Sequence, residues 1–151
     1  MDSLNQTAKA GLRQDDDQEQ QYLLFQSNDL RIGIEVEYVV ETIINHSITR
    51  LPLVPDYVRG VINLRGEVIP IVDIRLRLGQ RGERNDSVIV INVNDTQMGI
   101  LVDQVDQMVK LPKRQILPVP ERNEQKLICG MSSLPDGGVM LVLDCPALLE
   151  T

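Results

Sequence analysis

Short runs of apolar residues alternate with polar and turn-forming residues along most of the chain. From Tyr22 onward this alternation is typical of an all-β sandwich or barrel. We expect strands over residues 21–26, 31–34, 59–64, 67–72, 87–92, 97–102, 106–111, 127–134 and 138–143. One segment departs from the pattern, because its apolar residues follow the helical spacing i, i+3, i+4 and i+7: Val36, Val39, Val40 and Ile43. Their β-branched side chains lower the propensity for that helix.

The sequence also repeats itself weakly. The segment IGIEVEYVVETI (32–43) aligns with MGILVDQVDQMV (98–109), and the run that begins at Gly60 aligns with the run that begins at Gly130. In both copies the last strand ends at an aspartate, Asp73 or Asp144, that can cap a short helix. The repeat predicts two similar small β units that are each too small to be stable alone. We place these intertwined units at roughly 21–86 and 87–151, after a polar tail over 1–20 that we expect to be disordered.

Composition and charge restrict the class of protein. With 151 residues, of which 42% are hydrophobic and 3% aromatic, the chain can build one aliphatic core or two small ones. The net charge of −7 opposes nucleic-acid binding, which needs clustered positive charge. A small-barrel nucleic-acid-binding protein is nevertheless an alternative, since IRLRLGQRGER (74–84) is basic, although it lacks aromatic residues for base stacking. No apolar run reaches the ~18 residues of a membrane span, so we expect a cytoplasmic protein without direct membrane insertion.

Residues for catalysis or metal binding are sparse. His46, the only histidine, lies in a loop-like stretch without a nucleophile motif such as GxSxG, and one histidine is too few for a histidine-based metal site. Cys129 and Cys145 lack CxxC spacing, and no GxGxxG or GxxxxGKS/T loop is present to cradle a phosphate. We expect no catalytic residues, no metal and no cofactor. We interpret the chain as a non-enzymatic protein that binds other proteins through strand edges and the junction of its units.

The run GVINLRGEVIPIVDI (60–74) is almost wholly apolar but contains an arginine. Strand alternation places Val61, Asn63 and Arg65 on one face, and the glycine that follows permits a turn. Two interpretations are open. Arg65 forms a bidentate pair with a carboxylate of a partner, or it bonds to its own turn or to a neighbouring acid. Pro70 has no N–H to donate and therefore suggests an edge strand.

Five segments in order resemble the CheW family, the coupling proteins of bacterial chemotaxis: YLLF, IGIEVEYVVET, VRGVINLRGEVIPIVDIRLRLG, VIVINV with MGILVDQV, and GMSS with GVMLVLD. The resemblance covers about residues 20–150, and its NLRG-x-V-x-P-x-x-D core (63–73) is highly specific. It implies a mainly β fold of two packed SH3-like five-stranded β-barrels with short helices, which fits the internal repeat.

The resemblance also implies a function. Members of the family are non-enzymatic adaptors that connect the cytoplasmic tips of chemoreceptors to the regulatory domain of a CheA-type histidine kinase, in receptor arrays at the inner face of the membrane. The alternative within the family is an adaptor of a pilus-motility or other chemosensory-type array.

Carried over by position, the resemblance implies a receptor-binding groove between the barrels, formed by Val36, Val39, Glu41, Gly60, Asn63, Arg65, Gly99 and Met108. It implies a kinase contact around Ile48, Arg50 and Leu51. Structural roles compete with these: the valines can be core residues, the glycines can serve backbone shape, and Met108 can simply fill space. Glu41 has no obvious apolar role, which favours a polar contact.

Overall fold

The computed structural model describes residues 18–44, 47–80, 87–119 and 127–149. Its strands are β1 (Glu19–Ser27), β2 (Leu30–Glu35), β3 (Val39–Ile44), β4 (Val58–Leu64), β5 (Glu67–Asp73), β6 (Ser87–Val93), β7 (Thr96–Val102), β8 (Gln104–Pro112), β9 (Leu117–Pro118), β10 (Ile128–Ser133) and β11 (Val139–Leu143). Short helical turns join them: η1 (Val36–Tyr38), α2 (Ile74–Arg77), η2 (Lys113–Gln115) and α3 (Cys145–Leu148). Residues 1–17 of the predicted tail lie outside the described residues. The tail was predicted to end at residue 20, but Glu19 and Gln20 already belong to β1.

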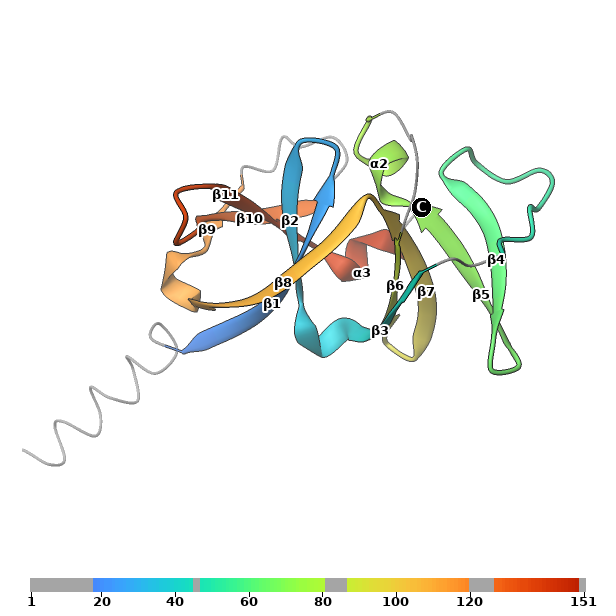
Figure 1. Ribbon diagram of the computed structural model, residues 1–151, viewed down its shortest axis with the longest axis horizontal. Coiled ribbons are helices and arrows are strands. Elements are labelled where there is room, and N and C mark those ends of the chain that lie inside the picture. Colours follow the sequence, from blue (N-terminus) through green and yellow to red (C-terminus); the bar gives the residue numbers. More distant parts are fainter. Residues whose placement is uncertain (1–17, 45–46, 81–86, 120–126, 150–151) are drawn as a thin grey trace, which may run out of the picture.

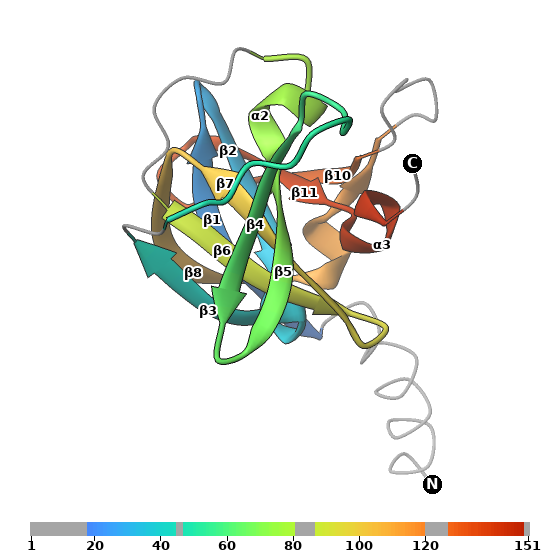
Figure 2. The ribbon, with the colours of Figure 1, turned by 90° about the vertical axis from the view of Figure 1, so that its right-hand side faces the viewer.

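The strands form two sheets that lie side by side (Figure 1). The six-stranded sheet has the order β8-β1-β2-β11-β10-β9, in which β9 has only 2 residues. The five-stranded sheet has the order β3-β6-β7-β5-β4. Figure 2 looks onto the five-stranded sheet, with β4 and β5 nearest to the viewer and α2 above them. The expected mainly β fold with two small barrel-like units and short helices is confirmed.

The internal repeat corresponds to an exchange of hairpins between the sheets. The β1–β2 hairpin of the first repeat pairs with β8 and β11 of the second repeat. In the matching way, the β6–β7 hairpin of the second repeat pairs with β3 and β5 of the first. The contacts β2–β11 and β7–β5 are parallel, whereas each hairpin is antiparallel. Each half of the chain therefore contributes strands to both sheets, and the predicted division near residues 86 and 87 does not coincide with the boundary between the sheets.

The helix predicted over residues 36–43 is wrong. Only Val36–Tyr38 forms a helical turn, the 3-10 turn η1, and Val39–Ile44 continues as strand β3. Half-buried and exposed residues alternate along β3, which is the period of a strand rather than of a helix. Pairing with β6 decides the conformation, because β-branched side chains fit a pleated sheet better than a helix.

The edge position inferred from Pro70 is also wrong, since β5 lies between β7 and β4. The parallel pairing of β5 with β7 starts only at Ile71. Pro70 therefore stands just outside that ladder, where its missing N–H removes no hydrogen bond to β7.

Three clusters of buried, mainly aliphatic side chains form the core. The largest joins the two sheets and includes Phe25 from β1 and Ile89 from β6, both fully buried. Each sheet also encloses a smaller cluster, which contains Leu24 in the six-stranded sheet and Ile71 in the five-stranded sheet. Because removal of apolar surface from water drives folding, the shared cluster makes each sheet depend on the other for the burial of one face.

A buried arginine ties the two sheets together. Arg75 of α2 is fully buried and donates from Nε and Nη2 to the two carboxylate oxygens of Asp73, at 2.9 and 3.0 Å. Its Nη1 donates to Asp103, which follows β7. The other oxygen of Asp103 accepts from the backbone N–H of Asn28, in the β1–β2 turn. A fork of N–H donors suits this double recognition, so the network connects the five-stranded sheet to a hairpin of the other sheet.

Both aspartates that were predicted to cap short helices do so. Asp73 accepts from the backbone N–H of Arg75 at 3.0 Å, and Asp144 accepts from that of Ala147 at 3.3 Å. Each cap satisfies one of the free N–H groups at the start of its helix.

Candidate functional site

The turn between β4 and β5 presents Arg65 to solvent. Arg65 has a φ of 52° and Gly66 a φ of 85°, so both central residues are left-handed, as the type I′ turn of a two-residue hairpin requires. The side-chain oxygen of Asn63 accepts from the backbone N–H of Gly66 at 3.0 Å. Asn63 thus stabilises the turn, and the side chain of Arg65 is 71% exposed.

Arg65 pairs with an acid of its own fold. Its Nη1 lies 2.7 Å from Oε2 of Glu41, on β3. Strands β3 and β4 are the two outer strands of the five-stranded sheet, so this ion pair bridges the open side of the barrel. Of the two interpretations of Arg65, the structure shows the neighbouring acid, while most of the guanidinium stays accessible. A pair so exposed contributes only about 0.2–1 kcal/mol to stability.

Four other residues of the predicted receptor groove are partly or fully inside the molecule. Val36 and Val39 are half-buried and pack against the core cluster shared by the sheets. Gly60 and Gly99 are buried, and a Cβ on Gly60 would lie 2.1 Å from the carbonyl oxygen of Thr49. The two glycines therefore add no side chain to the surface, whereas each of the two valines exposes part of its side chain.

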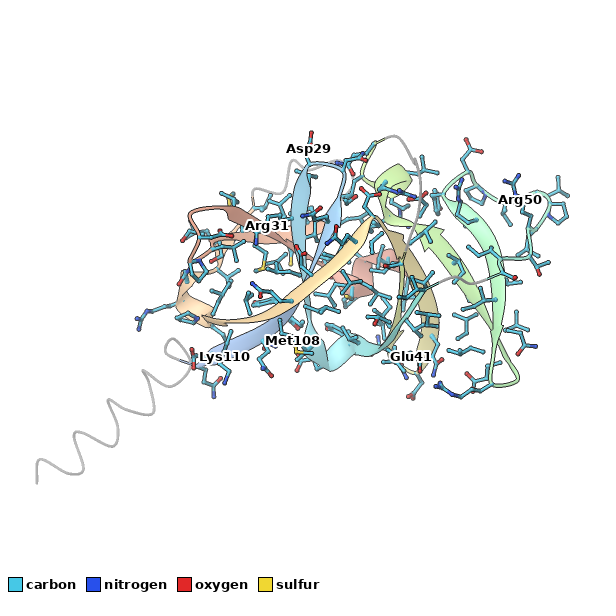
Figure 3. All side chains as sticks on the ribbon, in the orientation of Figure 1. Asp29, Arg31, Glu41, Arg50, Met108 and Lys110 are labelled. Atoms are coloured by element: carbon cyan, nitrogen blue, oxygen red, sulfur yellow. The ribbon has the colours of Figure 1, made fainter. Side chains whose placement is uncertain are left out.

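Met108 extends the surface toward the other sheet. It lies on β8 and is 58% exposed. Figure 3 shows Met108 and Glu41 along the same lower edge of the molecule, with η1 between them. Three of the predicted groove residues are therefore exposed: Asn63, Arg65 and Met108. Glu41 is partly exposed beside Arg65.

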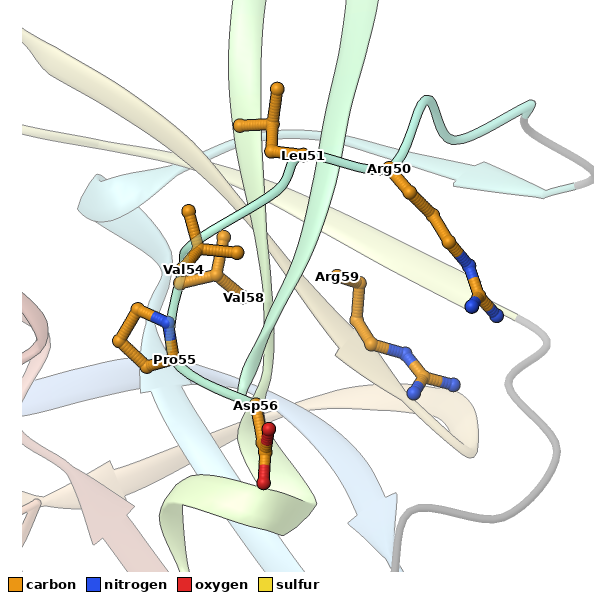
Figure 4. A pocket seen from close by; sticks show the side chains of 7 residues that line it. All are labelled: Arg50, Leu51, Val54, Pro55, Asp56, Val58 and Arg59. Atoms are coloured by element: carbon orange, nitrogen blue, oxygen red, sulfur yellow. The ribbon is translucent and has the colours of Figure 1, made fainter.

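The predicted kinase-contact residues lie on a separate surface, in the loop between β3 and β4. Ile48 is half-buried against the core of the five-stranded sheet, whereas Arg50 and Leu51 are exposed. Arg50 and Leu51 line a pocket of about 220 Å³, together with Val54, Pro55, Val58 and Arg59 (Figure 4). Figure 3 places Arg50 at the far end of the molecule from Lys110 of β8.

Sequence reasoning missed Leu53, which projects from the same loop. It is fully exposed, and its φ of 61° lies in the left-handed region. That conformation costs a side chain of this kind roughly 1–2 kcal/mol. The only signal in the sequence is its position in LPLVP, where a large apolar residue stands between two closely spaced prolines.

The basic stretch considered for nucleic acid does not form an exposed patch in its described part. Arg75 is enclosed by its carboxylate partners. The guanidinium of Arg77 stacks over the ring of Tyr57, 4.7 Å from the centroid. Arg81 and Arg84 lie outside the described residues.

The titratable groups with the largest changes lie near the passage from β2 to η1. Burial, followed by the side chain of Glu37, raises the pKa of Glu35 to about 7. Burial raises the pKa of Cys145 to about 12 and also raises that of Cys129, which suppresses the reactive thiolate form of both. His46 lies outside the described residues. Within the described ranges, His, Cys, Asp and Glu side chains nowhere gather in a group of three that could hold a metal ion, and no helix there is long and apolar enough to cross a membrane.

The structure is a two-barrel β protein whose barrels exchange hairpins. The turn that carries Arg65 lies on one surface, and the β3–β4 loop, with its apolar and basic side chains, lies on another. Residues 21–151 match the family model described as CheW-like domain. The chain therefore belongs to the CheW-like family.

Individual relatives agree with this assignment. The chain is 37% identical over 105 residues to the chemotaxis protein CheW of Klebsiella aerogenes, covering 68% of this chain and 63% of that protein. It is 33% identical over 118 residues to the chemotaxis protein CheW of Helicobacter pylori, covering 76% and 72%. Protein FrzA of Myxococcus xanthus is 33% identical over 106 residues, covering 68% and 66%. The crystal structure of the scaffolding protein TtCheW from Thermoanaerobacter tengcongensis superposes with a TM-score of 0.77 at 23% identity, covering 83% of this chain and 88% of that one.

Proposed function

We propose that the protein is a non-enzymatic adaptor that couples chemoreceptors to a CheA-type histidine kinase in chemotaxis signalling. The observation that carries this proposal is the match to the CheW-like family over residues 21–151. Several relatives are named as chemotaxis proteins, and the similar solved structure is named as a scaffolding protein. Such an adaptor works in the cytoplasm, at receptor arrays on the inner face of the membrane.

An adaptor needs two separate surfaces, and the predicted residues fall on two. The receptor surface contains Arg65, Glu41, Asn63 and Met108, and its shape rests on the half-buried and buried positions Val36, Val39, Gly60 and Gly99. The kinase surface contains Arg50 and Leu51 in the β3–β4 loop, supported from inside by Ile48. No chemical step is required of either surface.

Titration of the purified protein against a receptor-tip fragment and, separately, against the kinase regulatory domain tests this proposal. We expect the wild type to bind both. Arg65→Ala removes an exposed guanidinium from the receptor surface, so we expect receptor binding to weaken by about 10-fold, the effect of a typical contact residue, with kinase binding unchanged.

The control variant is Arg31→Ala. Arg31 lies on the six-stranded sheet, away from Arg65, and pairs there with Asp136 at 2.8 Å. It is expected to leave both affinities unchanged. Failure of the folded wild type to bind either partner would refute the adaptor function. Equal receptor binding by Arg65→Ala and the wild type would limit Arg65 to its ion pair with Glu41.

A further inference from the structure

Three positively charged side chains gather where β8 passes into η2. Lys110 lies near the end of β8, and Lys113 and Arg114 belong to η2. All three are exposed. The chain has a net charge of −7, so three cations within five consecutive residues form a local surface of the opposite sign. We call these three residues the cationic surface.

The acids of the described residues leave most of this charge uncompensated. Within the described part of the chain, Lys110 and Lys113 form no ion pair. Lys113 acts on the half-buried Glu35, but burial raises the pKa of that carboxyl group to about 7, so it carries only part of its negative charge at neutral pH. Glu19, opposite Pro112, is exposed and contributes one negative charge at this end of the sheet.

The start of β1 is fastened to the cationic surface through Gln18. The backbone N–H of Lys113 donates to the carbonyl oxygen of Gln18 at 2.7 Å, and Nζ of Lys113 donates to Oε1 of Gln18 at 3.3 Å. The antiparallel register continues from there, with Gln21 opposite Lys110. The residues that precede Gln18 in the sequence are therefore tethered at the cationic surface.

The three residues immediately before Gln18 are all aspartates, Asp15, Asp16 and Asp17. They lie outside the described residues, but three residues span at most about 11 Å, so their carboxylates stay within reach of the cationic surface. Such a short tether gives the carboxylates a high local concentration. Three negative charges thus match three positive ones in number and in position along the chain.

We propose that the acidic segment 15–17 docks on the cationic surface and is its resident occupant. Acidic segments from outside the chain then reach this surface only by displacing the tail. Met108 lies two residues before Lys110 on β8, so the period of a strand turns both side chains to the same face, and Figure 3 shows the two residues along the same lower edge. The docked segment therefore borders the receptor surface, although the proposal stands without the adaptor function.

Neutralisation of the tail tests the docking. The tail-neutral variant carries three substitutions: Asp15→Asn, Asp16→Asn and Asp17→Asn. Its control makes the same change of net charge at exposed positions outside β8 and η2: Asp29→Asn, Glu67→Gln and Asp95→Asn. The probe is a fluorescently labelled tri-aspartate peptide, and fluorescence anisotropy measures its affinity for each protein. Thermal unfolding establishes that each variant is folded.

At low salt we expect the tail-neutral variant to bind the peptide about 5- to 10-fold more tightly than the wild type, because the tail no longer competes through exposed ion pairs. The control should change the affinity by less than about twofold, since charges elsewhere on the surface are largely screened from this site. Addition of Lys113→Gln and Arg114→Gln to the tail-neutral variant should abolish the gain. High salt should also abolish it, because salt screens exposed charges.

Four results would overturn the proposal, and none of them bears on the adaptor function. Equal binding by the wild type and the tail-neutral variant would show that the tail does not occupy the surface. The same gain in the control would show a general effect of net charge. A gain that survives Lys113→Gln with Arg114→Gln would place the peptide elsewhere on the molecule. Absence of peptide binding by the tail-neutral variant would show that the surface does not hold carboxylates.

Discussion

Glu35 occupies the last position of β2, where the chain leaves the six-stranded sheet. It is half-buried, and the groups that act on its charge are Glu37 of η1, Asp144 before α3 and Lys113 of η2. Burial and the two acids outweigh the lysine, so the pKa of Glu35 rises to about 7. Because the folded state then holds the proton more tightly than the unfolded chain, this residue lowers stability as the pH rises from about 4.5 to about 7.

Glu35→Gln removes this effect because glutamine cannot ionise. We expect the variant to be more stable than the wild type at pH 8, by about 1 kcal/mol once the partial exposure of Glu35 is allowed for, and equally stable near pH 4.5. Urea unfolding at the two pH values measures the difference. The control Glu67→Gln removes an exposed carboxylate of β5 instead, so it tests whether the loss of any surface carboxylate gives the same change. The same advantage for Glu35→Gln at both pH values would contradict the prediction.

Arg65 shows what single positions reveal in a sequence. Alternation and the following glycine were sufficient to predict that it is exposed on a turn, because both depend only on local residues. Its partner Glu41 was also a predicted site residue, yet their contact was not predicted. The distance between them depends on the fact that β3 and β4 are the outer strands of one sheet, and strand order is not a local property.

At the scale of elements, the segment 36–43 shows how periodicity can mislead. Four β-branched residues fell at helical spacing, but Val36 belongs to η1, and the other three are compatible with alternation along β3. The decisive factor is the pairing with β6, some fifty residues away along the chain. By contrast, the strands flanked by clear turn residues were predicted within a few positions, since their two faces differ consistently in polarity.

The two parallel contacts between exchanged elements each have a glycine at the crossing. Gly99 of β7 faces Ile71 of β5, and a Cβ there would lie 2.5 Å from Cδ1 of Ile71 and 2.8 Å from Cγ1 of Val88. Gly33 of β2 occupies the matching place, where a Cβ would lie 2.5 Å from Sδ of Met140. The two sites differ in their neighbours, because the flexible side chain of Met140 can move aside more easily than the branched side chains of Ile71 and Val88.

We therefore expect Gly99→Ala to cost about 1–3 kcal/mol of stability through overpacking, and Gly33→Ala to cost clearly less. Chemical denaturation of both variants measures the difference. Gly66→Ala is the control for steric contact, since no atom lies within 4 Å of its Cβ position and only its φ of 85° is unfavourable for alanine. Equal costs at positions 33 and 99 would show that the side-chain neighbours do not decide tolerance.

At the scale of the whole molecule, the internal repeat correctly indicated two similar units, but it could not indicate which strands each sheet contains. Similar sequences fold into similar hairpins whether or not these are exchanged, so the pattern is the same in both cases. The exchange becomes visible only in the long-range pairing of β2 with β11 and of β7 with β5.

The buried network of Arg75 predicts how the molecule responds when the sheets are uncoupled. Arg75→Ala leaves the fully buried carboxylate of Asp73 without both of its hydrogen bonds to the guanidinium, and we expect a loss of about 3–5 kcal/mol of stability. Arg75→Lys keeps the charge but not the fork, so it should lose less. Urea unfolding measures the stability of both variants. The control is Arg31→Ala, at an exposed ion pair, which should lose only a small fraction of the free energy of unfolding that Arg75→Ala loses. A loss no larger than that of the control would show that the network does not stabilise the junction.

The exchange of hairpins also sets an order in which the protein can be completed during synthesis. All strands of the five-stranded sheet lie between residues 39 and 102, so they can pair before the later strands are available, although the face that they bury against the other sheet stays uncovered until that sheet is complete. The β1–β2 hairpin emerges first but must wait for β8 and β11 before either of its outer edges is covered. Because β11 inserts between β2 and β10, the six-stranded sheet is completed only when a late strand of the second repeat joins the first hairpin of the first repeat.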